Sequence, residues 1–156
     1  MKLKIALAAA LMLCAPALMA AHAQEASVYL NGGYTQFDGK GADPGALTGR
    51  VGVGFGKYFA VEGEGSIGVR KDSGVKLSSE MGAYGLAKLP IGERFDIFAK
   101  AGVARTDFSP GPNEGGFAYG AGGDFFFTDH DGIRADWTRH DYNDLNAYSV
   151  SYVRKF

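Results

Sequence analysis

The last nine residues of the chain, 148–156, alternate in character with a period of two and end on an aromatic residue, Phe156. One set of alternate positions holds Tyr148, Val150 and Tyr152, and the other holds Ser149, Ser151 and Val153. Side chains of a β-strand point alternately to opposite faces, so this pattern predicts a strand whose two faces meet different environments. A half-buried strand of a soluble β-sandwich is the other structure that this alternation describes.

The first 23 residues have the three parts of a secretory signal peptide. Lys2 and Lys4 precede an apolar run over residues 5–13, and Ala21 and Ala23 form an A-x-A cleavage site. The apolar run is too short for a transmembrane helix. We therefore predict a cleaved signal peptide over 1–23 and a single exported domain over 24–156. The only cysteine, Cys14, leaves with the signal, so we expect no disulfide in the exported chain.

The charge of the predicted exported domain excludes one class of partner. The formal net charge of the chain is −1, and removing the two signal lysines takes it to −1 − 2 = −3. Nucleic-acid binding needs a basic face, so we expect no nucleic-acid partner. The mean hydropathy of −0.08 is near neutral. Transmembrane β-barrels also have neutral averages, because apolar and polar residues alternate along each of their strands.

Alternation and turn residues divide the exported domain into eight strands. We expect them near residues 26–37, 47–56, 60–70, 77–89, 95–106, 117–127, 132–139 and 148–155. The connections between them alternate in length, with long ones over 38–46, 71–76, 107–116 and 140–145. Strands of about 9–12 residues, with long loops at one end and short turns at the other, describe an up-and-down barrel that crosses a bilayer. The predicted fold is all-β: an eight-stranded antiparallel up-and-down transmembrane β-barrel.

Charged residues in the central portions of the predicted strands fall on one face only, which we assign to the barrel lumen. They are Arg50, Glu62, Glu64, Glu80, Lys88, Lys100, Asp124, Arg134 and Asp136. An Arg or Lys facing lipid near the bilayer midplane costs about 2–4 kcal/mol, whereas in the lumen it pairs with an acid. In a soluble sandwich, the same residues would mark the solvent face. Outer-face aromatic residues gather toward the strand ends, as in the girdles of membrane barrels.

Two stretches and the last residue of the chain resemble the outer-membrane protein β-barrel domain family, the small eight-stranded barrels of OmpA/OmpX type. They are GRVGVGFGKYFAVEGEGSIG at 49–68, LAKLPIGERFDIFAKAGVA at 86–104, and the terminal Phe156. The resemblance covers the exported chain and implies no catalytic residue. It also implies an assembly signal, here Tyr148, Val150, Tyr152 and Phe156. Arg154 stands where these barrels usually carry an aromatic residue, so the signal departs from the family pattern.

These features predict an integral outer-membrane protein that is exported to the bacterial outer membrane and is not a wide pore. We expect a structural, envelope-integrity or surface-interaction role through four external loops, chiefly 38–46 and 107–116. The expected partners are outer-membrane lipid and lipopolysaccharide, periplasmic chaperones and the barrel assembly machinery. We expect a monomer with no cofactor and no metal.

Two other functions remain open at this point. A lipid A-modifying enzyme needs a nucleophile beside a histidine, and His140 with Ser149 or Ser151 is the available set. We expect His140 to be a solvated loop-end residue instead. A soluble, periplasmic lipocalin-like barrel would bind an apolar ligand and would turn its apolar faces inward.

Overall fold

A computed structural model describes residues 26–39, 41, 43–72, 74, 76–109 and 111–156. The predicted signal peptide, with Ala21 and Ala23, lies outside the described residues, so its cleavage stays a prediction. No helix among the described residues is long and apolar enough to cross a membrane.

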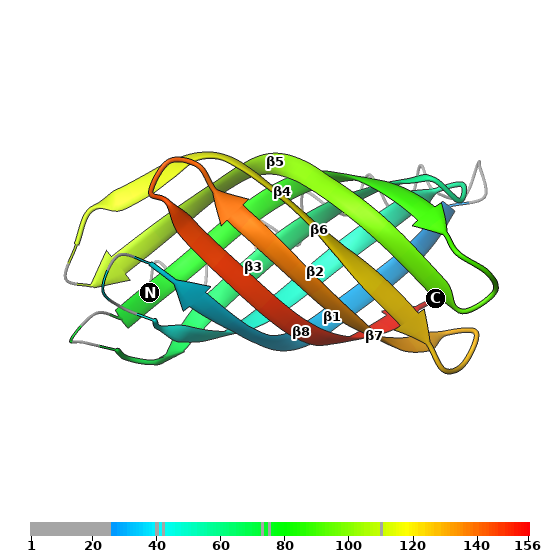
Figure 1. Ribbon diagram of the computed structural model, residues 1–156, viewed down its shortest axis with the longest axis horizontal. Helices are drawn as coiled ribbons and strands as arrows, with labels where there is room; N and C mark the ends of the chain where they lie inside the picture. The colour runs from blue at the N-terminus through cyan, green and yellow to red at the C-terminus, as the bar shows by residue number, and fades with distance from the viewer. Residues whose placement is uncertain (1–25, 40, 42, 73, 75, 110) are drawn as a thin grey trace.

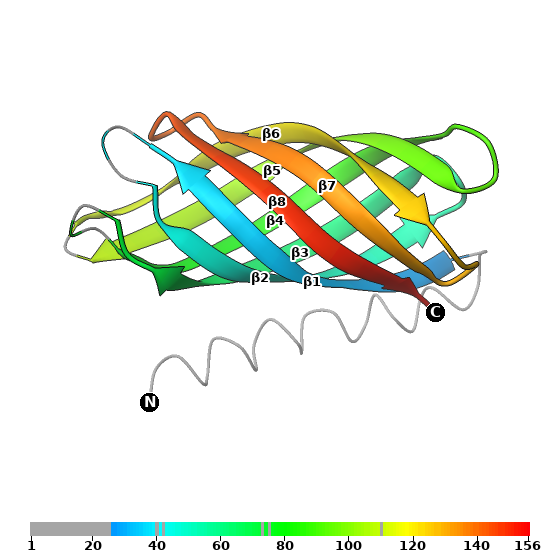
Figure 2. The same ribbon diagram turned by 60° about the horizontal axis from the view of Figure 1, so that its bottom comes forward.

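Eight antiparallel strands form a closed barrel in which each strand pairs with its neighbours in the chain (Figure 1). The strands are β1 (Ala26–Asp38), β2 (Gly45–Phe55), β3 (Phe59–Arg70), β4 (Lys76–Pro90), β5 (Phe95–Ser109), β6 (Asn113–Phe126), β7 (Asp131–His140) and β8 (Leu145–Lys155). Pairing of β1 with β8 closes the barrel, from Tyr29 opposite Lys155 to Asp38 opposite Asn146 (Figure 2). The predicted fold class is confirmed.

The alternation along each strand sorts side chains between the lumen and the outer surface. On β5, Phe98 and Lys100 are 4% and 3% exposed, whereas the outward Val103 is 61% exposed. The outer wall carries large apolar side chains from every strand, among them Leu30, Leu47, Ile67, Met81, Ile97, Phe117, Ile133 and Val150. An apolar exterior around a charged interior suits a lipid environment. It is the reverse of the arrangement that the lipocalin-like alternative requires, so that alternative is wrong in its orientation of the faces.

The barrel has one end at which β1 begins and β8 ends. We call it the periplasmic end, after the corresponding end of outer-membrane barrels, and we call the opposite end extracellular. The turns of the periplasmic end span 56–58, 91–94 and 127–130. Gly56 and Gly92 in these turns have φ angles of 67° and 82°, which side chains rarely adopt. The opposite, extracellular end holds the connections 39–44, 71–75, 110–112 and 141–144.

The predicted alternation of long and short connections holds for the first four, 39–44, 56–58, 71–75 and 91–94, but fails from 110–112 onward, because the strands extend into the expected loops. Residues 107–116 form the tip of a β5–β6 hairpin in which Asp107 pairs with Asn113 and Arg105 with Gly115. Beyond the lipid a strand needs no apolar face, so polar, glycine-rich residues remain paired through their backbones. In Figure 1 this hairpin reaches further from the barrel centre than the β7–β8 connection. Residues 38–46 are shortened in the same way to the connection 39–44.

A charged residue introduced on the outer wall tests whether that face of the strands points to lipid. Ala101 lies exposed on β5, so Ala101→Arg should destabilise the folded barrel in lipid by about 2–4 kcal/mol. Urea titration of refolding into lipid vesicles measures this change. Asn113→Arg, on the exposed extracellular part of β6, is the matched control and should have little effect. Equal stability of the two variants would mean that β5 does not face lipid at Ala101.

Candidate functional site

The lumen holds all nine charged side chains that the sequence assigns to the inner face. Eight of them are at most 8% exposed, and the side chain of Lys88 is 10% exposed. They come from six strands, β2 to β7, so no single element forms the network. Eight of them form two clusters, centred on Arg134 and Arg50, which meet where Arg50 Nε lies 3.7 Å from Glu62 Oε1; the ninth, Glu80, pairs with His140.

Arg134 is the centre of the cluster nearer the periplasmic end. Its Nε and Nη2 donate to the two carboxylate oxygens of Asp124 at 2.6 and 2.9 Å, and its Nη1 donates to Glu62 Oε2 at 2.6 Å. Tyr29 donates its hydroxyl hydrogen to the same Glu62 oxygen at 2.9 Å. The guanidinium lies 4.5 Å from the centre of the Phe98 ring. Bidentate pairing and ring stacking both use the planar geometry of arginine, which lysine lacks.

Arg50 organises the second cluster. Its Nε donates to Glu64 Oε2, and its Nη1 donates to Asp136 Oδ1 at 3.1 Å. Lys100 Nζ donates to the other Asp136 oxygen at 3.0 Å and lies 3.8 Å from Glu64. Each carboxylate is therefore shared by two cations, and β2, β3, β5 and β7 are tied together across the lumen.

Lys88 links the Arg134 cluster to the periplasmic rim. Its Nζ lies 3.6 Å from Asp124 and 3.8 Å from Asp96. Asp96 is also 3.7 Å from Lys155, whose ammonium lies 3.6 Å from the centre of the buried Phe126 ring. Side chains therefore extend across the lumen close to this end.

A ladder of hydroxyl groups adds to the network, and our sequence analysis missed it. Thr35 and Thr48 are 2.6 Å apart, Thr48 and Ser66 are 2.8 Å apart, and Thr35 donates to Ser149 at 3.1 Å. All four are buried. They occupy inner-face positions in the predicted alternation. Their place on that face, rather than their residue type, could have shown that they point into the lumen.

An apolar cap closes the extracellular end of the lumen. It consists of the buried residues Phe37, Ala46, Leu77, Leu145 and Ala147, with Phe108 packed against them. Phe37 and Leu77 have no exposed surface at all. The cap joins residues from β1, β2, β4, β5 and β8, close to the connections of the extracellular end.

His140 lies fully buried beneath this cap, and the prediction of a solvated loop-end histidine is wrong. Its exposed fraction is 0%, and its Nε2 lies 3.3 Å from Glu80 Oε1. Its ring lies 6.3 Å from Phe37 and 5.7 Å from Tyr142, measured between ring centres. The last inner-face position of β7 falls at His140, so the ring points into the lumen although the residue ends its strand.

Tyr142, in the 141–144 connection, lies beside His140 and packs against the buried cluster that includes Ala104 and Ala118. Its hydroxyl is 2.6 Å from Thr106 Oγ1, which in turn donates to Glu80 Oε2 at 3.3 Å. Burial raises the pKa of Tyr142 well above its usual value, so its hydroxyl stays protonated across the physiological range.

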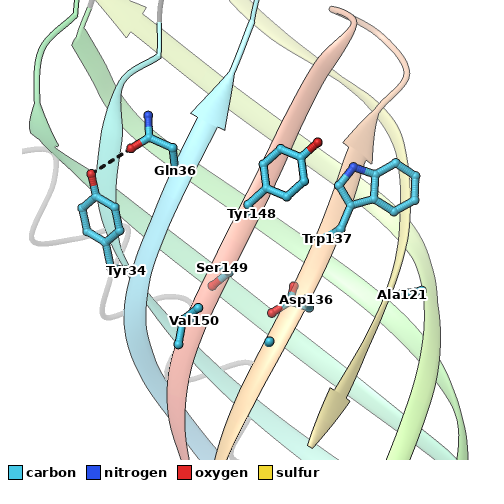
Figure 3. A pocket seen from close by; sticks show the side chains of 9 residues that line it. Tyr34, Gln36, Ala121, Asp136, Trp137, Tyr148, Ser149 and Val150 are labelled. Carbon is cyan, nitrogen blue, oxygen red and sulfur yellow. Dashed lines mark hydrogen bonds between the residues drawn. The ribbon is translucent and has the colours of Figure 1, made fainter.

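The outer wall has a shallow groove on the extracellular side of β6, β7, β8 and β1. Trp137 and Tyr148 stand side by side there, and Tyr34 donates to Gln36 at 3.1 Å (Figure 3). Trp137 Nε1 donates to Asn146 Oδ1 at 3.1 Å. Amphipathic rings in this position are typical of the interfacial girdle of a membrane barrel.

The predicted assembly signal lies on the outer face of β8, where Tyr148, Val150, Tyr152 and Phe156 are exposed. Arg154, the departure from the family pattern, pairs with Asp131 at 3.1 Å, and the Tyr152 hydroxyl donates to the same carboxylate. The role of these residues in assembly stays a prediction.

The chemistry expected of a lipid A-modifying site is not assembled around His140. The histidine contacts Glu80, while Ser149 accepts a hydrogen bond from Thr35. Within the described ranges, no group of three or more His, Cys, Asp or Glu side chains could hold a metal ion.

Comparison with known proteins identifies the family. The model of the outer membrane protein beta-barrel domain matches residues 5–156. The chain belongs to this family. Membership implies the bacterial outer membrane as its location. No functionally curated protein matches the chain significantly.

Solved structures share the fold of this family member at low sequence identity. Ail of Yersinia pestis, solved in complex with the heparin analogue sucrose octasulfate, is 15% identical with a TM-score of 0.62, over 84% of this chain and 99% of Ail. The N-terminal β-barrel domain of Pseudomonas aeruginosa OprF is 13% identical with a TM-score of 0.64, over 83% and 97% of the two chains. Neisserial surface protein A is also 13% identical, with a TM-score of 0.54 over 83% and 95%.

Removing the central arginine tests the dependence of the barrel on its lumen network. Arg134→Met leaves Asp124 and Glu62 buried without their main partner, which should lower the free energy of unfolding by about 3–5 kcal/mol. Urea titration in lipid vesicles measures the change. Arg94→Met is the matched control, because Arg94 makes an exposed hydrogen bond to the Phe127 carbonyl and should contribute at most about 1 kcal/mol. A loss below 1 kcal/mol at Arg134 would contradict a network that depends on this residue.

Two glycines test how tightly the lumen is packed. A Cβ on Gly52 would overlap the ring of the buried Tyr29, whereas a Cβ on the outward Gly63 would meet nothing within 4 Å. Gly52→Ala should therefore destabilise the barrel by about 1–3 kcal/mol through overpacking. Gly63→Ala should leave stability unchanged or raise it. Both are measured by the same titration, and equal effects would mean that the Tyr29 ring moves freely.

Proposed function

We propose that this protein is a structural component of the bacterial outer membrane: a monomeric, non-conducting barrel that contributes to envelope integrity. The observation that carries the proposal is the filled lumen. Two clusters of buried ion pairs lie between the apolar cap at one end and Lys155 with Phe126 at the other. An eight-stranded barrel has an interior just wide enough for side chains, so these groups occupy the space that a channel needs.

The form of the extracellular end favours a structural role over recognition by long loops. The four connections there span no more than 39–44, 71–75, 110–112 and 141–144. Loops that recognise partners are usually longer and more variable than the connections of a scaffold. The contacts most directly available to this barrel are therefore with outer-membrane lipid and lipopolysaccharide, through its apolar wall and its aromatic girdles.

The charge of the extracellular rim argues against a polyanionic partner. In the sequence, the acidic residues at this end are Asp38, Asp43, Asp72, Asp107, Glu114, Asp141 and Asp144, and the basic ones are Lys40, Arg70, Lys71, Lys76, Arg105 and Arg139. Ail was solved with a heparin analogue, which is a polyanion. A rim in which acidic and basic residues nearly balance has no excess of positive charge to attract such a ligand, so we do not extend that interaction to this chain. Periplasmic chaperones and the barrel assembly machinery are the partners that we propose for its biogenesis.

We further propose that the protein is not an enzyme. His140 is the residue on which a lipid A-modifying activity would depend, and its burial against Glu80 beneath the apolar cap separates it from lipid. A catalytic base has to reach the proton that it abstracts, directly or through one water molecule.

Conductance and envelope permeability test the two parts of the proposal. Refolded wild-type protein in planar bilayers should give no steady single-channel currents, whereas a wide porin in the same bilayers should conduct. Large, steady currents would overturn the non-conducting barrel.

A deletion strain should become more sensitive to bulky antibiotics and to detergent, and the wild-type gene should restore resistance. A variant with Asp38, Asp43, Asp141 and Asp144 changed to Asn should also restore it, because the proposed role depends on the barrel rather than on rim contacts. A deletion without any permeability change would remove the envelope-integrity role. Rescue by wild type but not by the rim variant, at equal protein level, would point to a surface-interaction role instead.

A further inference from the structure

The charges of the lumen balance except at one position. Four carboxylates, Glu62, Glu64, Asp124 and Asp136, are paired with four cations, Arg50, Lys88, Lys100 and Arg134. Asp96 and Lys155 pair separately at the periplasmic rim. The fifth fully buried carboxylate is Glu80, which is 2% exposed, and its only ion-pair contact in the described chain is His140. The lumen is therefore neutral when the Glu80–His140 pair holds one proton.

The surroundings of His140 provide little else to compensate a charge. β3 contributes Glu64, which is shared by Arg50 and Lys100 and whose negative charge also acts on both His140 and Glu80, and β4 contributes Glu80 and the phenol of Tyr84. β1 presents the apolar Phe37, β8 presents both the side chain and the polar backbone of Leu145, and β5 presents the hydroxyl of Thr106. The 141–144 connection presents the Tyr142 hydroxyl, on the far side of which lies Glu114 of β6. Neither Nδ1 nor Nε2 of His140 makes a hydrogen bond of good geometry with a described residue, so Nε2 meets Glu80 Oε1 at an ion-pair distance of 3.3 Å.

We propose that the Glu80–His140 pair is a proton-dependent latch on the extracellular cap. With one proton, the pair is an imidazolium beside a carboxylate, and it ties β7 to β4 beneath Phe37 and Tyr142. At acidic pH the carboxylate of Glu80 takes up a second proton and becomes neutral. The buried imidazolium then loses its ion-pair partner, and the remaining carboxylate that acts on it, Glu64, is already shared by Arg50 and Lys100, which is unfavourable. Admission of water to the cap relieves this cost, and the 141–144 connection is the segment that moves.

The contacts of this connection make it the element that opens. Tyr142 is held by its hydrogen bond with Thr106, the hydroxyl that also donates to Glu80. The backbone is held by the Asp141 amide, which donates to the Phe117 carbonyl at 3.1 Å. An exposed ion pair between Arg139 and Asp144 at 2.7 Å adds a contact that water already reaches. Protonation of Glu80 thus acts on the Thr106 hydroxyl, which links the buried Glu80–His140 pair to Tyr142 in the 141–144 segment.

Amide hydrogen exchange of the refolded protein in lipid nanodiscs tests the latch. Protection factors corrected for the intrinsic pH dependence should fall at least tenfold at residues 140–145 between pH 7.5 and pH 4.5. Those of Ala99 and Ala101 in the barrel wall should not change. In wild-type protein, the side-chain carboxyl carbon of Glu80 should titrate with the same midpoint as the loss of protection. Unchanged protection, or a different midpoint, would overturn the proposal.

Two variants separate the latch from other acids near the connection. Glu80→Gln combined with His140→Phe keeps two side chains of similar size but removes the titration, so protection at 140–145 should no longer depend on pH. Asp144→Asn removes the exposed ion pair with Arg139 and leaves Glu80 and His140 in place, so its pH response should match that of wild type. A response that persists in the double variant, or that disappears in Asp144→Asn, would assign it to surface carboxylates. The wild-type carboxyl titration decides the matter if the double variant fails to fold.

Discussion

Every charge in the lumen needs a partner there, and this requirement organises the rest of the structure. Arg134 illustrates it, since its guanidinium is bound by Asp124 on the adjacent strand β6 and by Glu62 across the barrel on β3. Such cross-lumen pairs connect strands that share no backbone hydrogen bonds. The closed sheet satisfies the backbone, as a lipid environment demands, and the ion pairs determine which side chains share the space inside it.

The charged network requires small residues at particular places on the inner face. Gly52 leaves room for the Tyr29 ring, which in turn orients its hydroxyl toward Glu62. Gly122 does the same for Phe98, the ring on which the Arg134 guanidinium stacks. Glycine normally weakens a strand, so its presence at Gly52 and Gly122 is explained by the rings beside it, and at Gly102 and Gly120 by the close approach of a neighbouring backbone. Packing and charge compensation therefore constrain each other at the same positions.

The sequence predicted the strands and their two faces well, because a period of two is a local signal that a one-residue error would invert. It predicted the connections poorly. Residues 107–116 contain prolines and several glycines, yet their ends pair as strands, since nothing in a local pattern shows whether a polar segment is backbone-paired above the lipid. The prediction that His140 is solvated failed for a related reason. A histidine at a strand end resembles a solvated residue, and only the closing of the barrel brings Phe37, Glu80 and Tyr142 around it.

The boundary between lipid and water explains where outward charges occur at both rims of the barrel. An outward charge is costly at the middle of the wall and inexpensive at the interfaces, so Arg154 is tolerated where the family usually has an aromatic residue. There it pairs with Asp131, which also accepts the Tyr152 hydroxyl and so joins the ends of β7 and β8. At the other rim, Arg105 and Arg139 face outward and pair with Asp107 and Asp144. The zone without outward charges, between these two sets of pairs, marks the part of the wall that lipid covers.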